Sequence, residues 1–145
     1  MRLTQEADYA LRIVSTLAKG GGTMDSRTVS VKACVPERFT VKILRKLVLG
    51  GIVASKKGSA GGYILAVSPD EITMLSVVEL IDEPISISRC LDGEYECTKN
   101  NDKSCCVFHM IFAKLSSGLA DKLGSITIAD ATDDSVSIES ILEKI

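Results

Sequence analysis

Four cysteines and the only histidine of the chain fall within one short polar segment. They follow the spacing C-x6-C-x7-C-C-x2-H and are Cys90, Cys97, Cys105, Cys106 and His109. Thiolates are soft ligands that suit iron–sulfur clusters and zinc, and an imidazole nitrogen can complete either ligand set. This concentration of donors predicts a metal centre in the segment.

The spacing of the donors bears on the kind of metal and on the kind of chemistry. Closed structural zinc sites usually carry two short C-x2–4-C knuckles, which this segment lacks. The irregular spacing therefore favours an iron–sulfur cluster, with zinc as the alternative. The vicinal pair Cys105–Cys106 is not the C-x-x-C arrangement of thiol oxidoreductases, and no phosphate loop, catalytic triad or nucleotide fingerprint is present. We expect a protein that is not an enzyme.

The cellular compartment affects how the cysteines are interpreted. The N-terminal residues lack the layout of a secretory signal peptide, and no apolar run is long enough to span a membrane. We therefore expect a cytoplasmic protein with no membrane partner. In a reducing compartment, clustered cysteines favour metal ligation over disulfides. The remaining cysteine, Cys34, lies apart on a predicted helix, where we expect a small buried side chain.

The elements that would position the metal segment begin with three helices. Apolar residues at helical spacing predict a first helix from Leu3 to Ala18. A second helix, capped by Asp25 or Ser26, is expected to end near Cys34, and a third is expected over residues 36–49 after the break at Val35–Pro36. Two short helices with a tight break between them are typical of a helix-turn-helix.

A β-hairpin follows the three helices. Residues 52–55 and 63–67 are apolar, strand-like runs, and the intervening residues 56–62 are rich in glycine and lysine. A hairpin with a flexible basic tip is a wing, which can reach along a DNA groove. The fold class predicted is mainly α with a small β-hairpin wing, and a winged helix-turn-helix DNA-binding domain is expected over residues 1–83.

The distribution of charge supports binding to double-stranded DNA. The net charge is −2 overall, but eight basic residues and one acid, Glu37, lie between Arg27 and Lys57. A basic module joined to an acidic remainder is typical of a protein that binds phosphates with one face.

The chain beyond the wing divides into three parts. Residues 84–106 form the cysteine-rich loop, and residues 104–124 form a long amphipathic helix with an apolar stripe that needs a partner. A second copy of the same helix is the economical partner, which predicts a homodimer with residues 104–124 at its interface. Packing of the stripe against the first helix is the alternative. We expect two short helices in the tail, residues 125–145.

The first helix, the third helix, the wing ending in Gly61-Gly62-Tyr63 and the cysteine segment together resemble the Rrf2 family of bacterial transcription regulators. The resemblance covers nearly the whole chain to about Leu123, and it is of the iron–sulfur cluster regulator (IscR) and nitric-oxide sensor (NsrR) type. It implies a homodimeric winged helix-turn-helix protein that binds operator DNA, often as a repressor, and senses redox, iron or nitric-oxide status.

The resemblance also implies a ligand set. Cys90, Cys97 and Cys106 would be the cluster thiolates, and His109 would be the fourth ligand of a two-iron, two-sulfur cluster. In members of the nitric-oxide-sensing type, an aspartate at the position of Asp8 comes from the partner subunit to a four-iron, four-sulfur cluster. The cysteine spacings here are longer than usual, and the cysteine doublet makes Cys105 an alternative ligand to Cys106.

For DNA, the resemblance implies that Arg38 and Lys42 face base edges, that Lys57 in the wing reaches the minor groove, and that Thr40 and Arg45 contact phosphates. Val41 replaces an acid that helps the iron–sulfur cluster regulator to choose between operator types, which implies a different operator preference. Phe39 is expected to pack rather than to read bases. The remaining predicted DNA contacts are Arg27, Lys56, Gly58 and Ser59.

Overall fold

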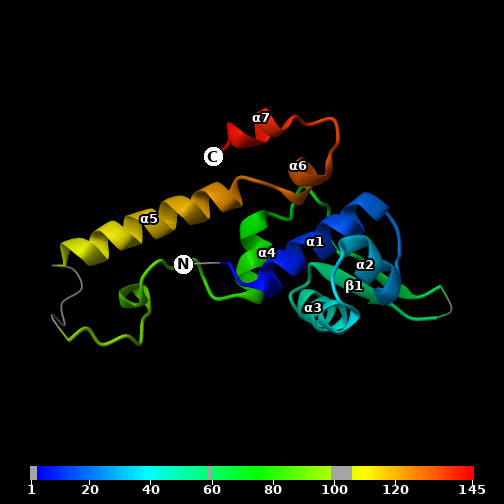
Figure 1. Ribbon diagram of the computed structural model, residues 1–145, viewed down its shortest axis with the longest axis horizontal. Helices are drawn as coiled ribbons and strands as arrows, with labels where there is room; N and C mark the ends of the chain where they lie inside the picture. The colour runs from blue at the N-terminus through cyan, green and yellow to red at the C-terminus, as the bar shows by residue number, and fades with distance from the viewer. Residues whose placement is uncertain (1–2, 59, 99–105) are drawn as a thin grey trace.

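The computed structural model describes residues 3–58, 60–98 and 106–145. It confirms the mainly α fold with one two-stranded antiparallel hairpin. The first three helices are α1 (Gln5–Gly20), α2 (Ser26–Ala33) and α3 (Glu37–Leu49), and they pack on one another (Figure 1). The wing lies at one end of the long axis of the molecule, and the cysteine segment lies towards the other end.

Local side-chain chemistry accounts for the limits of these helices. The Thr4 hydroxyl accepts a hydrogen bond from the Ala7 amide at the start of α1, and the Asp25 carboxylate accepts one from the Thr28 amide at the start of α2. Such N-caps each stabilise a helix by about 1 kcal/mol. Pro36 precedes the first residue of α3 and provides a φ of −57° without needing a hydrogen-bond partner for an amide.

The prediction that Cys34 is buried is wrong. Cys34 ends α2 in the left-handed conformation, with φ 53°, and its side chain is exposed. The left-handed residue turns the chain into α3, so the position is determined by the turn between the two helices and not by packing of the thiol.

The wing consists of β1 (Val53–Lys56) and β2 (Gly62–Leu65), with Val53 opposite Leu65. Its strand β2 is bonded to the loop before α2, where Met24 and Tyr63 exchange two backbone hydrogen bonds of 2.9 and 2.8 Å. Gly62 has φ +151°, and a Cβ there would lie 2.4 Å from the Met24 carbonyl oxygen. Only glycine permits this close approach of the wing to the helical part of the domain.

The helix α4 (Met74–Ile81) packs against the core and is preceded by the N-cap Thr73, which forms a capping box with Ser76. One aliphatic cluster, without tryptophan, joins the helices to the wing. Its fully buried larger side chains are Ile13, Val14, Leu17, Val29, Ile43, Leu44, Leu47, Val53, Ile72, Val77 and Ile128.

The chain then runs through a 3-10 turn, η1 (Arg89–Leu91), to the long helix α5 (Val107–Gly124). The helix begins at Val107 and not near Ser104, because Cys106 has extended backbone angles of −92° and 110° and serves as the N-cap. Ser104 and Cys105 lie outside the described residues. Cys106 and His109 are therefore a cap residue and a first-turn residue, rather than two positions within the helix.

The apolar stripe of α5 has no cover along much of its length. The helix packs against α4 and η1, while five apolar side chains near its N-terminal half remain 47–66 % exposed. These are Val107, Phe108, Met110, Ile111 and Leu115. In the single chain, then, a continuous hydrophobic face remains open to a partner.

The tail forms the two short helices that were expected, α6 (Ile128–Thr132) and α7 (Ile138–Leu142). The first of them is part of the winged-helix core. Ile128 is 1 % exposed and belongs to the core cluster, and Met74 and Ile128 donate backbone hydrogen bonds to Ile126 and Ile72 respectively. The expected boundary near residue 125 thus divides residues that pack in one core.

Replacing Ile128 with alanine should lower the free energy of unfolding by about 2–5 kcal/mol, because it removes a buried aliphatic side chain and leaves a cavity. Ile138, on α7, is 70 % exposed and provides the matched control. We expect Ile138→Ala to change the free energy of unfolding by less than about 0.5 kcal/mol. Denaturant titration of both variants measures the difference, and equal stabilities would contradict the placement of α6 in the core.

Candidate nucleic-acid interface and metal segment

The side of α3 that faces away from the core carries three of the predicted DNA contacts. Arg38, Lys42 and Arg45 are all exposed there, while Ile43, Leu44 and Leu47 are buried on the opposite side. The Arg38 guanidinium lies 4.8 Å from the centroid of the Phe39 ring, which in turn meets the Tyr9 ring edge-on at 5.8 Å. This stacking holds Arg38 in place and confirms that Phe39 packs.

Basic residues from two further elements lie at the same end of the molecule (Figure 1). Arg27 is exposed in the first turn of α2, and Lys56, Lys57 and Gly58 are exposed in the wing. Ser59 lies outside the described residues. Exposed cations from a helix-turn-helix and a wing can bind the phosphates that flank a major groove.

Thr40 is not part of this surface. Its side chain is fully buried, and its hydroxyl lies 3.3 Å from both the Val35 and the Pro36 carbonyl oxygens, to which it donates. The proposed phosphate contact at Thr40 is therefore wrong. The hydroxyl instead satisfies backbone carbonyls in the turn between α2 and α3.

One charged contact of α3 was missed from the sequence. Glu6 of α1 accepts from Lys42 at 3.0 Å through Oε2 and pairs with Lys46 at 2.9 Å through Oε1. The pairing with Lys46, followed by the hydrogen bond from Lys42 and by the charges of both lysines, lowers the pKa of the Glu6 carboxyl against the opposing effect of burial. Glu6 and Lys42 are far apart in the sequence, so no local pattern indicates the pairing.

The beginning of the cysteine segment, residues 84–106, is bonded to α5. The Ile87 amide donates to the Ser116 hydroxyl at 3.2 Å, and Ser116 is buried. The next turn is η1, which contains Cys90, and the Ser88 hydroxyl donates to the Cys90 sulfur at 3.3 Å. Cys90 is therefore held beside α5 with a polar partner at its sulfur.

The other donors lie at or near the N-terminus of α5. Cys106 is the N-cap residue, and His109 lies in the first turn. The His109 Nδ1 atom is buried and has no hydrogen-bond partner among the described residues. Cys97 is partly buried, and Cys105 lies outside the described residues.

The described donors do not form a preassembled site. Within residues 3–58, 60–98 and 106–145, no three side chains of histidine, cysteine, aspartate or glutamate come together in a group that could hold a metal. Their chemistry fits a metal centre, and His109 presents a ring nitrogen that lacks a partner in this part of the chain. Asp8, the alternative ligand, forms an ion pair of 2.8 Å with Arg12, and both side chains are about half exposed.

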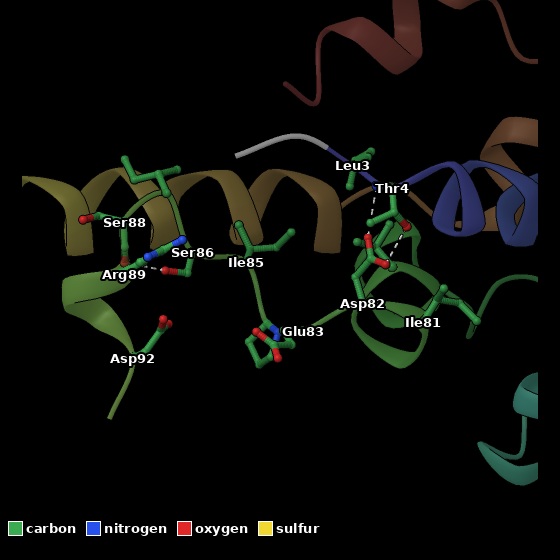
Figure 2. A pocket seen from close by; sticks show the side chains of 13 residues that line it. Leu3, Thr4, Ile81, Asp82, Glu83, Ile85, Ser86, Ser88, Arg89 and Asp92 are labelled. Carbon is green, nitrogen blue, oxygen red and sulfur yellow. Dashed lines mark hydrogen bonds between the residues drawn. The ribbon is translucent and has the colours of Figure 1, made fainter. Parts of the chain in front are cut away.

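A groove of about 660 Å³ lies between the start of α1 and residues 81–92 (Figure 2). At one end the Thr4 hydroxyl and amide donate to the Asp82 carboxylate at 2.6 and 3.2 Å. Arg89 and Asp92, which belong to the cysteine segment, lie at the other end. The groove thus separates the cysteine segment from the helix that carries Glu6.

Three helices, a basic wing and exposed cations on α3 define a winged helix-turn-helix DNA-binding regulator. The chain belongs to the Rrf2 family, because the family model described as "Iron-dependent Transcriptional regulator" matches residues 3–134. This is a family of transcriptional regulators and not of enzymes. Among the described residues, no helix has both the length and the apolar character needed to cross a membrane.

Similar proteins agree with this assignment. The transcriptional regulator IscR of Sodalis glossinidius is 29 % identical over 145 residues, which cover 99 % of this chain and 83 % of that protein. The structure of CymR, the global cysteine regulator of B. subtilis, has a TM-score of 0.72 at 24 % identity and covers 91 % of this chain and 96 % of its own. The structure of T. potens IscR has a TM-score of 0.68 at 22 % identity, with coverages of 93 % and 88 %.

Proposed function

We propose that this protein is a homodimeric repressor whose binding to operator DNA responds to an iron–sulfur cluster held by the cysteine segment. The ligands proposed are Cys90, Cys97, Cys106 and His109, in a two-iron, two-sulfur cluster. A four-iron, four-sulfur cluster with Asp8 of the partner subunit is the variant form. Operator DNA lies in the cytoplasm of bacteria, where the regulator would act.

The proposed DNA contacts rest on exposure and position. Arg38 and Arg45 are exposed on α3, and neither takes part in an ion pair among the described residues. Arginine can donate two parallel hydrogen bonds to guanine in the major groove. Lys57 in the wing would enter the neighbouring minor groove, and Arg27 would contact the backbone.

The proposed dimer rests on the open face of α5. Five exposed apolar side chains in one half of a helix are costly in water, and burying them against the same face of a second copy gives a closed two-fold interface. Two winged helices would then be set at a spacing determined by α5, which suits an operator with two half-sites.

The observation that carries the metal proposal is the buried His109 Nδ1 atom, which has no partner in the described part of the chain. A buried polar atom without a partner is destabilising by about 1–3 kcal/mol, and metal ligation would satisfy it. A bound cluster would supply a centre whose charge and ligation change with redox state, iron supply or nitric oxide.

The surrounding contacts suggest how such a change would reach the DNA. Residues 87–91 are held against α5 by the bond between Ile87 and Ser116, so a rearrangement near Cys90 would bear on the dimer helix. Coupling of about 1–3 kcal/mol is enough for a 5–150-fold change in operator affinity.

The first test is the iron and acid-labile sulfide content of protein purified without oxygen, with its visible absorption spectrum. We expect equal amounts of iron and sulfide and a visible absorption band. The triple variant Cys90→Ala, Cys97→Ala, Cys106→Ala should lose the iron, the colour and the response of DNA binding to oxidants or nitric oxide.

Cys34→Ala is the matched control, since it removes an exposed thiol that lies on α2 and not in the metal segment. It should keep both the iron and the response. A triple variant that still responds to the signal would refute cluster sensing. His109→Ala should lose iron or sulfide while circular dichroism shows an unchanged helix content.

A second candidate function is a regulator that responds to a small ligand, with a structural zinc or an idle cysteine segment. The groove beside Thr4, Asp82 and Arg89 favours it, because its lining combines polar and charged groups with the apolar side chains of Leu3, Val78 and Ile81. Stoichiometric zinc without sulfide would support this function over the first.

A further inference from the structure

Glu6 holds two lysines of α3 at once. The Lys42 ammonium lies 3.0 Å from Oε2 and the Lys46 ammonium lies 2.9 Å from Oε1. The Glu6 side chain is only 22 % exposed, whereas the Lys42 side chain is 57 % exposed and lies on the face of α3 that carries Arg38 and Arg45. The carboxylate therefore sits at the edge of the surface proposed to bind DNA.

The charges of Glu6, Lys42 and Lys46 determine how strongly this part of α3 attracts DNA phosphates. Two ammonium groups that share one carboxylate carry a net charge of one, and each donates a hydrogen bond or ion pair that a DNA phosphate would otherwise receive. Arg38 and Arg45 are not restrained in this way by any acid among the described residues. Glu6 thus competes with phosphate for Lys42 and Lys46, and in the described part of the chain for these two residues alone.

We propose that Glu6 is a specificity-determining residue, which keeps Lys42 and Lys46 from non-specific phosphates and yields Lys42 only where a fully docked operator holds two base acceptors against it. Guanine presents two acceptors in the major groove, and a correctly docked operator brings them to α3. A loosely held duplex of arbitrary sequence does not, so Lys42 stays with Glu6. This inference rests on the proposed DNA interface, and it adds a restraint that weakens non-specific binding.

The test measures binding of the full-length protein to two duplexes as a function of salt. One duplex has random sequence, and the other is an operator selected by the native protein from a random pool. The variant Glu6→Gln keeps the side-chain shape but releases both lysines. Each additional phosphate contact strengthens binding about 5-fold at about 0.15 M salt and steepens the salt slope by about 0.9.

We expect E6Q to bind the random duplex about 5- to 30-fold more tightly than the native protein, with a salt slope steeper by about 1–2. Binding to the selected operator should tighten by less, so the ratio of the two affinities falls. Unchanged affinity and slope for the random duplex, or weaker binding to it, would overturn the inference.

Asp134→Asn is the matched control. It changes the net charge by the same amount and also breaks a lysine pair, since Asp134 lies 2.9 Å from Lys19, but neither residue is on α3. It should leave the affinity for the random duplex within about 2-fold of native. An equal gain in D134N and E6Q would mean that net charge alone is responsible, and would overturn the role of Glu6.

The triple variant Glu6→Gln, Lys42→Gln, Lys46→Gln tests the same idea, because it removes both lysines without leaving an unpaired carboxylate beside the DNA. If Glu6 withholds both lysines from phosphates in the native protein, the triple variant keeps a non-specific affinity and a salt slope close to native, although operator binding weakens. A loss of non-specific affinity as large as the removal of two phosphate contacts would overturn the inference. Failure of the native protein to bind any duplex would refute the proposed function itself, whereas native operator binding with no effect of E6Q would refute only the role of Glu6.

Discussion

Replacing Arg38 and Arg45 together with alanine is expected to weaken operator binding by about 30- to 700-fold. A bidentate contact of arginine with guanine contributes about 1–3 kcal/mol, and a phosphate contact contributes about a further 5-fold at physiological salt. Both side chains are exposed on the outer face of α3, away from the buried Ile43 and Leu47. Fluorescence anisotropy with a labelled operator measures the loss, and unchanged melting temperatures confirm that the fold is intact.

The double variant Lys19→Ala, Lys144→Ala is the control for a general loss of positive charge. It removes the same positive charge, and the two lysines lie on the last turn of α1 and at the C-terminal end, paired with Asp134 and Asp130. We expect less than about a 3-fold change in operator affinity, because charges more than a Debye length from DNA are largely screened. Comparable losses in both double variants would contradict specific contact by α3.

Placing glutamate at Ile111 and Leu115 should convert the proposed dimer to a monomer. These side chains are 47 % and 58 % exposed and lie one turn apart on the open face of α5. Two like charges on each copy, brought together across a two-fold axis, are strongly unfavourable in an apolar contact. Light scattering should give half the native molar mass, and operator affinity should fall by about 100-fold or more, since the two half-sites no longer bind as one unit.

The matched control uses two equally exposed apolar residues of α7. Ile138 and Leu142 are 70 % and 58 % exposed, so Ile138→Glu with Leu142→Glu adds the same charge at a different surface. This variant should remain dimeric and bind the operator as the native protein does. A native protein with the mass of a single chain, or dissociation by the α7 variant alone, would show that α5 is not the interface.

Helix limits and the hairpin were predictable because they depend on neighbours in the sequence. Asp25 and Thr73 are cap residues that contact amides three positions later, and Pro36 restricts the residue before it. The apolar stripe of α5 was also predictable, because its apolar residues recur at helical spacing. Its need for a partner followed because few other apolar segments of the chain remain to cover it.

Two predictions about single side chains were wrong, and they were wrong for different reasons. Thr40 lies on the same side of α3 as Ile43, Leu44 and Leu47, so the helical periodicity of the sequence already indicated that it is buried. The predicted phosphate contact came instead from the resemblance to the Rrf2 family. Cys34 was predicted to be buried because its thiol is hydrophobic. The residue instead ends α2 with a left-handed backbone, and this turn determines its position.

Two further features required the fold itself. Glu6 meets Lys42 only because α1 crosses beside α3, and α6 is too short, at five residues, to show a periodic pattern. The metal ligands remain a prediction, since Cys105 and residues 99–104 lie outside the described structure and the described donors are not gathered into a site.

The close contact between Gly62 and Met24 limits how this protein can transmit a signal. The paired backbone bonds between Met24 and Tyr63, and the absence of room for a Cβ at Gly62, join the base of the wing to the loop that begins α2. The helix α2 also packs on α3, and α3 contacts β1, so the wing and α3 should move together as one rigid unit. A change at the far end of the chain would then act by shifting the distance and angle between the two winged helices of the proposed dimer. Regulation would then depend on the number of base pairs that separate the half-sites: operators that differ only in that spacing would respond differently to the same signal.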